Sequence, residues 1–119
     1  SYIYLPKDAR ILAHTQEYIG TTSDSCITTM MKARSSMGRV NVAVCTDAGW
    51  GDIGYMNRWT MEIHNNSGCD MILLVGMRVA QLVFLASSQP LNAYQGKYNL
   101  EDVVWTPDMM LPKLYKDLK

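Results

Sequence analysis

The stretch RWTMEIHN, residues 58–65, alternates apolar and polar side chains. Its odd-numbered positions from Trp59 to Ile63 are apolar, and its even-numbered positions from Thr60 to His64 are polar. Strict alternation of this kind is typical of a β-strand with one face in the core. Glu62 therefore stands in the middle of a strand, on the polar face. An exposed surface glutamate and a partly buried acid/base group both fit this position, and the pattern leaves the two open.

Similar short runs lie on both sides of this stretch, with turn residues between them. The sequence NNSG at residues 65–68 is a turn signal. We expect strands at residues 2–6, 9–15, 25–31, 39–46, 58–65, 71–76 and 78–86, with the run at 71–76 buried. Residues 31–38 resemble a short helical turn. The predicted fold class is all-β, as an antiparallel sandwich or barrel.

The character of the chain changes after Pro90. The remaining residues include polar side chains and two further prolines, and they keep no sustained period. We expect one β domain over residues 1–93. Residues 94–119 are expected to form a C-terminal tail or arm that closes on the active site or on a neighbouring subunit.

Composition excludes several classes of function. The 119 residues carry 11 basic and 11 acidic side chains, so no bulk positive field attracts nucleic acid. No apolar run is long enough to span a membrane, and no signal peptide is visible. The three cysteines are odd in number and widely spaced, which favours a reducing cytoplasm. No His or Cys stands at ligand spacing from another, so no zinc site is expected.

Three short segments could bind a ligand. RSSMGR, residues 34–39, sets two hydroxyl groups between two arginines, which fits a small anion site, but a serine helix cap with solvated arginines fits equally well. AGWGDIGY, residues 48–55, has three glycines that let the backbone approach a nucleoside, although Asp and Gly are also common turn residues. YQGKY, residues 94–98, could fold over a triphosphate or remain a solvated loop.

Taken together and in this order, ARSSMGR (33–39), AGWGDIGYMNRWTMEIHNN (48–66), GMRVAQLVF (76–84) and YQGKY closely resemble the dCTP deaminase branch of the dUTPase superfamily. The resemblance covers nearly all of residues 1–101. It implies a dUTPase-like distorted β-barrel of the β-clip type. It also implies a homotrimer with active sites between subunits, which binds dCTP or dUTP together with Mg²⁺.

The resemblance further implies roles for individual residues. Glu62 occupies the position of the catalytic glutamate, and Asp52 the acidic position of the base-binding loop. The implied substrate-binding residues are Arg34, Ser35, Ser36, Arg39, Ala48, Trp50, Tyr55, Tyr94, Lys97 and Tyr98. Two positions depart from the family pattern: Asp47 replaces a usual Thr, and Glu101 replaces a Gln in the tail, where a carboxylate would repel phosphates.

Glu62 favours deamination of dCTP to dUTP, because one carboxylate can take a proton from the attacking water and deliver it to N3 of cytosine. No zinc is then required, and the His and Cys signature of zinc deaminases is missing from the sequence. Asp52 leaves a second reaction open, the hydrolysis of dUTP to dUMP and pyrophosphate. A dUTP diphosphatase and a nucleotide-binding relative without turnover remain as alternatives.

Overall fold

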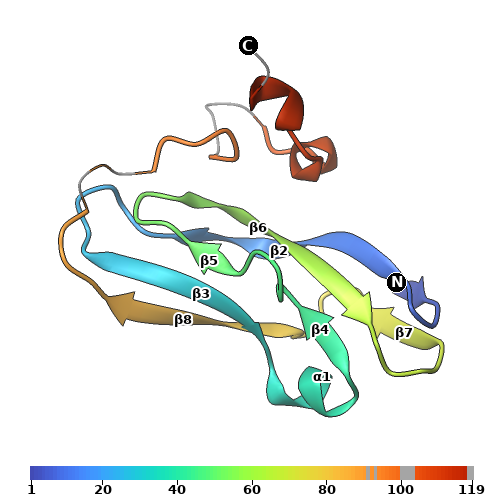
Figure 1. The fold of residues 1–119 in the computed structure, drawn as a ribbon. Coiled ribbons are helices and arrows are strands. Elements are labelled where there is room, and N and C mark those ends of the chain that lie inside the picture. Colours follow the sequence, from blue (N-terminus) through green and yellow to red (C-terminus); the bar gives the residue numbers. More distant parts are fainter. Residues whose placement is uncertain (91, 93, 100–103, 118–119) are drawn as a thin grey trace.

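The computed structural model describes residues 1–90, 92, 94–99 and 104–117, and its regular structure is mostly β (Figure 1). The strands are β1 (Tyr2–Leu5), β2 (Arg10–Gly20), β3 (Ile27–Ala33), β4 (Val42–Val44), β5 (Trp50–Gly51), β6 (Met56–Asn65), β7 (Met71–Leu74) and β8 (Ala80–Ala86). One short helix, α1 (Ser35–Arg39), follows β3. Two 3₁₀ turns, η1 (Pro107–Met110) and η2 (Leu114–Asp117), lie near the C-terminus. No helix among the described residues has the length and apolarity needed to cross a membrane.

The strands form two three-stranded sheets and one two-stranded ribbon, all antiparallel. In one sheet β6 lies between β2 and β4, and in the other β3 lies between β5 and β8, while β1 pairs with β7. The described strands do not close into one continuous barrel, because no ladder joins the three sheets. The all-β prediction is therefore confirmed, and the barrel is open. The main core consists of Leu5, Met31, Met37, Val42, Val44, Cys45, Trp59, Met61, Ile63 and Leu73.

Strand β6 confirms the alternation read from residues 58–65. The side chains of Trp59, Met61 and Ile63 are each less than 5% exposed, and those of Thr60, Glu62 and His64 are only partly covered. Burial of an aromatic or large aliphatic side chain contributes about 1.5–3 kcal/mol, so the apolar face fixes the register of the strand. That register sets Glu62 opposite Leu12 of β2.

Other segments differ from the sequence prediction. The predicted strand at 9–15 continues to Gly20 across a register irregularity between His14 and Tyr18. The predicted strand at 39–46 shortens to β4, because α1 extends to Arg39. The prediction that residues 71–76 are buried was wrong. Leu73 is buried, but Ile72 and Leu74 are about 60% exposed, because β7 pairs with β1 alone and covers only one face.

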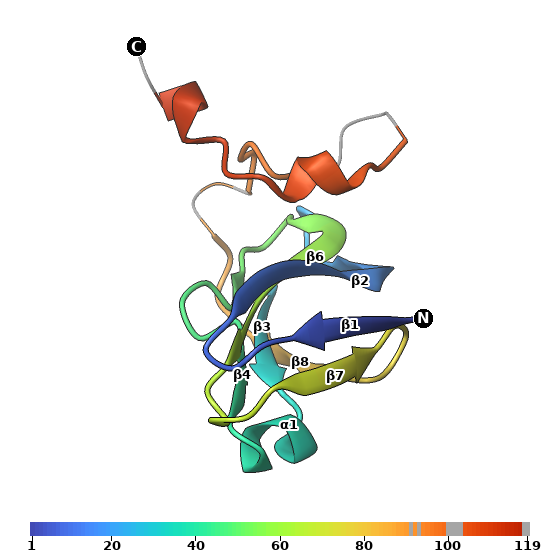
Figure 2. The ribbon, with the colours of Figure 1, turned by 90° about the vertical axis from the view of Figure 1, so that its right-hand side faces the viewer.

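The C-terminal tail and helix α1 lie at opposite ends of the molecule (Figures 1 and 2). In both views the tail, with its two 3₁₀ turns, passes over the end of the sheets near β2 and β6. Helix α1 lies at the other end, below β4 and β7. Any site that uses both segments therefore has to span the length of the domain.

Candidate active site

Glu62 lies in the wall of a cavity of about 350 Å³ between the β2–β6 sheet and the tail. The strand alternation aims its side chain away from the core, and the tail covers that face. Its Oε2 atom is shielded from solvent and has no hydrogen-bond partner among the described residues. A shielded carboxylate oxygen without a donor is costly, which is typical of a group kept for chemistry rather than for stability.

Seven of the twelve site residues predicted from the sequence meet in this cavity: Ala48, Trp50, Asp52, Tyr55, Glu62, Tyr94 and Tyr98. The sequence had not assigned the other lining residues, which are Leu12, Trp59, Thr60, Met110 and Pro112. The cavity is therefore mainly aromatic and aliphatic, with two carboxylates in its wall. Flat apolar walls with a few polar groups suit a planar heterocyclic base.

The loop at residues 48–55 is held against the sheets at a glycine. A side chain could not be added at Gly51, because its Cβ would lie 2.0 Å from the Thr29 hydroxyl oxygen and 2.6 Å from the Trp59 ring. The loop turns where the Tyr55 amide donates to the Asp52 carbonyl oxygen, 3.0 Å away. These contacts bring the loop's polar and aromatic side chains to the cavity.

Tyr55 is the central ring of an aromatic cluster. It meets Trp59 and Tyr94 edge to face, with ring centroids 5.9 Å and 5.4 Å apart. Burial, followed by the nearby Tyr94 hydroxyl, raises the pKa of Tyr55 to about 12. Its phenol therefore remains protonated at neutral pH and can donate a hydrogen bond.

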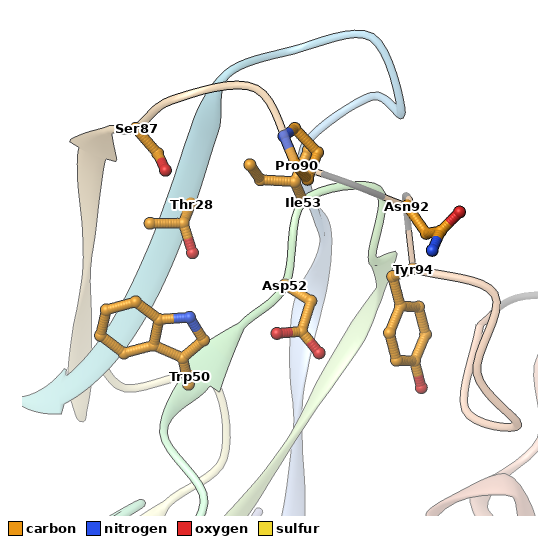
Figure 3. Close-up of a pocket in the computed structure, with 8 residues that line it drawn as sticks. All are labelled: Thr28, Trp50, Asp52, Ile53, Ser87, Pro90, Asn92 and Tyr94. Carbon is orange, nitrogen blue, oxygen red and sulfur yellow. The ribbon is translucent and has the colours of Figure 1, made fainter.

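A second cavity of about 330 Å³ adjoins the first and shares Trp50, Asp52 and Tyr94 with it (Figure 3). Figure 3 shows the Asp52 carboxylate in the opening between Trp50 and Tyr94. The remaining lining residues include the polar side chains of Thr28, Ser87 and Asn92. Asp52 can thus face a ligand in either cavity.

The first part of the tail is attached beside the loop by backbone and amide hydrogen bonds. The Tyr94 amide donates to the Ile53 carbonyl oxygen at 2.8 Å, and the Asn57 side-chain amide donates to the Tyr98 carbonyl oxygen at 2.8 Å. Lys97 does not line the cavity, and its ammonium group lies 2.6 Å from an Asp117 carboxylate oxygen instead. Glu101, the departure noted in the sequence, lies outside the described residues.

Comparison with known proteins identifies the family of this chain. Residues 1–87 match the family model described as dCTP deaminase-like. The chain belongs to the dCTP deaminase-like family. A curated relative from Persephonella marina, named "dCTP deaminase, dUMP-forming", is 38% identical over 98 residues, which are 82% of this chain and 52% of that protein. A relative of the same name from Methanobrevibacter smithii is 40% identical over 79 residues, 66% of this chain and 40% of that protein.

A solved structure has a similar fold. The EIAV dUTPase superposes with a TM-score of 0.64 at 18% identity, over 83% of this chain and 79% of that one. This likeness supports the dUTPase-type β fold. The chain spans about half the length of the curated dCTP deaminases that it matches.

Part of the cavity lies beyond the residues that match the family model. We call residues 104–113 the C-terminal strap. Trp105 packs on His14 with ring centroids 4.3 Å apart, and the Arg58 guanidinium lies 5.1 Å from the Trp105 ring. Met110 and Pro112 then line the cavity that contains Glu62. The apolar residues Trp105, Met109 and Met110 are the part of the sequence that indicates this cover.

The segment at residues 34–39, which was predicted from the sequence to bind phosphate, lies away from both cavities. Within the described part of the chain, none of Arg34, Ser35, Ser36 and Arg39 lines either cavity. Arg34 donates to the Arg78 carbonyl oxygen at 3.2 Å, while the other three side chains are exposed on α1. The serine-cap interpretation was wrong, because Arg34 occupies the N-cap position and makes no side-chain cap bond.

Proposed function

We propose that this chain deaminates dCTP to dUTP, with Glu62 as the group that moves protons. The observation that carries this proposal is the partly shielded Glu62 carboxylate in the wall of an aromatic cavity of suitable size for a pyrimidine. Relatives named "dCTP deaminase, dUMP-forming" support the substrate class over about half of their length.

The proton transfers can be written for one carboxylate. Glu62 accepts a proton from water as the water oxygen attacks C4 of cytosine, and then passes this proton to N3. In the tetrahedral intermediate the hydroxyl on C4 gives up its proton through the same carboxylate to N4. The C4–N4 bond breaks and ammonia leaves, so dCTP and water yield dUTP and ammonia. We propose that this proceeds without a zinc ion.

The base would lie among Trp50, Tyr55 and Ala48, with Tyr94 and Tyr98 closing the cavity from the tail side. A cover of this kind excludes bulk water and strengthens the electrostatic interactions of Glu62 with the base. Lys97 is also a proposed phosphate ligand. It would have to exchange its Asp117 partner for a phosphate oxygen, and the ion pair is exposed enough for that exchange to cost little.

We propose that a homotrimer completes the site. The exposed hydroxyls of Ser35 and Ser36 and the Arg39 guanidinium can bind a triphosphate, but they lie far along the domain from the cavity of the same chain. A second copy that presents its α1 to this cavity would supply them. The exposed apolar face of the β1–β7 ribbon, at Tyr2, Tyr4, Ile72 and Leu74, is a surface that such an assembly could cover.

Mg²⁺ is expected to bind with the triphosphate rather than in a protein cage. Among the described residues, no group of three His, Cys, Asp or Glu side chains is placed to hold a metal ion. Phosphate oxygens of a substrate are common ligands of Mg²⁺. When bound, the cation would neutralise part of the phosphate charge. Asp52 is the acidic side chain shared by both cavities, so the nucleotide could bring the cation near it.

A second reaction is favoured by the position of Asp52. Its carboxylate borders both cavities, where it could orient a water molecule toward the α-phosphate and release pyrophosphate from dUTP. The words "dUMP-forming" in the relatives' names agree with this extension. The alternatives are a dUTP diphosphatase and a relative that binds nucleotide without turnover.

One experiment separates these possibilities. The protein is incubated with dCTP or dUTP and Mg²⁺, ammonia is measured, and nucleotides are resolved by chromatography. We expect ammonia release from dCTP that falls about 100-fold or more in Glu62→Gln, the scale typical for loss of a general acid/base, with dCTP binding retained in calorimetry. Ammonia release at the wild-type rate in the variant would refute the role of Glu62. Turnover of dUTP alone would favour the diphosphatase.

A further inference from the structure

Cys45 lies directly across from Glu62, one residue beyond the end of β4. Its amide donates a hydrogen bond to the Glu62 carbonyl oxygen at 2.9 Å, which continues the pairing of Val44 with Ile63. Cys45 is 3% exposed, whereas Cys26 and Cys69 are on the surface. A thiol therefore stands next to the proposed acid/base in a place closed to solvent.

The backbone at Cys45 is strained in a way that other residue types would relieve. Its φ is +53°, in the left-handed region that favours Gly or Asn over a residue with an ordinary side chain. The following turn is tightly packed, since a Cβ at Gly49 would lie 2.8 Å from both the Cys45 and the Met31 carbonyl oxygens. The strain persists because the turn is fixed, and strain of this kind is concentrated at functional sites.

One oxygen of the Glu62 carboxylate lacks a hydrogen-bond donor, and the Cys45 thiol is a group that could donate to it. Its Oε2 atom is shielded and has no hydrogen-bond partner among the described residues. Burial, followed by the nearby charge of Glu62, raises the pKa of the Cys45 thiol to about 11. The thiol is thus a neutral S–H donor at physiological pH. The other ionisable groups around the cavity are those of Asp52, Tyr55, Tyr94 and Tyr98.

We propose that Cys45 is a positioning residue for Glu62, whose S–H group donates to the carboxylate and fixes its orientation toward the bound base. The proposal rests on the proposed role of Glu62 as the acid/base. A thiol is a weak neutral donor, so it orients the carboxylate without cancelling its charge, and the carboxylate stays able to accept a proton from water.

The hydrogen bond is tested first without any substrate. In protein carrying Cys26→Ser and Cys69→Ser, the Raman S–H stretching band comes from Cys45 alone. We expect this band at the lowered frequency of a hydrogen-bonded thiol, and we expect it to rise when Glu62→Ala removes the acceptor. A band at the frequency of a free thiol, or one that Glu62→Ala does not move, would overturn the proposal whatever the enzyme's activity.

The effect on the reaction is tested with three replacements of Cys45. Cys45→Ala removes the donor, Cys45→Ser keeps one, and Cys45→Gly removes it while relieving the positive φ. We expect kcat for dCTP deamination to fall about tenfold in the Ala and Gly variants, the scale of one lost hydrogen bond, with KM changed less than about twofold. The Ser variant should recover most of this loss.

Melting temperatures separate positioning from folding. Cys45→Gly should be at least as stable as Cys45→Ala, because glycine fits the left-handed backbone. Activity that follows the melting temperature through this series, rather than the presence of a donor, would overturn the positioning role. If wild-type protein does not deaminate dCTP while the S–H band behaves as expected, the proposed function fails and the hydrogen bond stands.

Discussion

Trp105 of the C-terminal strap packs against His14 of β2, with ring centroids 4.3 Å apart and the planes inclined by 53°. Trp105 also contacts Arg58, whose guanidinium lies 5.1 Å from the Trp105 ring. The same guanidinium lies 4.8 Å from the Tyr18 ring. The strap is thus attached to the sheet at the irregularity in β2, where Arg58 also donates to the Thr15 carbonyl oxygen at 3.2 Å. This attachment brings Met110 and Pro112 over the cavity that contains Glu62.

Replacing Trp105 should therefore open the cavity while leaving the sheets folded. Aromatic and cation–π contacts contribute about 0.5–1.5 kcal/mol each, so Trp105→Ala should raise the KM for dCTP about tenfold and expose the strap to proteases. Limited proteolysis with mass spectrometry, together with steady-state kinetics, measures both effects. Val104→Ala is the matched control, because Val104 is 87% exposed. An unchanged KM with a released strap would show that the cover has no part in binding.

The sequence predicted the strand that carries Glu62 because alternation is a local property. The residues that cover each face of β6, in contrast, come from distant parts of the chain. The burial of Glu62 depends on Met110 and Pro112, about 50 residues later in the chain, and no period in the tail indicates that contact. The run at 71–76 was predicted to be buried because its composition is apolar. Its actual burial depends on how many strands pair with β7, which composition does not indicate.

The predicted site residues fall into two groups, those that lie near Glu62 in the same chain and those that do not. The aromatic and acidic residues of the loop lie near Glu62 because β5 pairs with β3 and Gly51 packs against Thr29 and Trp59. The motif from Arg34 to Arg39 matches the family in sequence, but α1 lies at the far end of the domain. Motif order along a chain carries no information about which copy of the chain supplies each part of a shared site.

Gly51 should tolerate no side chain. Its Cβ would overlap the Thr29 hydroxyl and the Trp59 ring, so Gly51→Ala should lower the free energy of unfolding by about 1–3 kcal/mol, the usual cost of overpacking. Gly38→Ala is the control, because nothing lies within 4 Å of a Cβ there, and alanine in a helix should be neutral or stabilising by about 0.5–1 kcal/mol. Urea denaturation followed by tryptophan fluorescence compares the two. Equal stabilities would contradict the tight packing of the loop.

Asp52 should decide between one reaction and two. If its carboxylate orients the water that attacks the α-phosphate, wild-type protein converts dCTP to dUMP and pyrophosphate, and Asp52→Asn accumulates dUTP. Anion-exchange chromatography of quenched samples gives the ratio of the two products. Wild-type protein that yields only dUTP would leave Asp52 as a residue that binds the substrate without a second reaction.

The β1–β7 ribbon should lose stability at low pH through Asp70. The Tyr4 hydroxyl donates to its carboxylate at 2.6 Å and the Lys7 amide at 2.8 Å, and these bonds lower the pKa of Asp70. A lowered folded pKa means that the contribution is present above the unfolded value of about 3.9 and is lost as pH falls through the folded value. Wild-type protein should therefore melt slightly above Asp70→Asn at pH 7, and the difference should disappear near pH 2. A difference that persists at pH 2 would contradict this linkage.

The shared-site model makes a prediction about mixtures of inactive chains. Glu62→Gln should remove proton transfer, and Arg39→Ala should weaken phosphate binding, so each variant alone should have little activity. If Glu62 of one subunit meets Arg39 of its neighbour, refolding the two variants together at equal amounts should restore about a quarter of the wild-type sites, because each site then draws its two halves independently. Ammonia release from dCTP by the refolded mixture measures the recovery, and mixing without refolding is the control. If both residues act in the same chain, every site carries one defect and the mixture stays inactive, whatever its sedimentation coefficient.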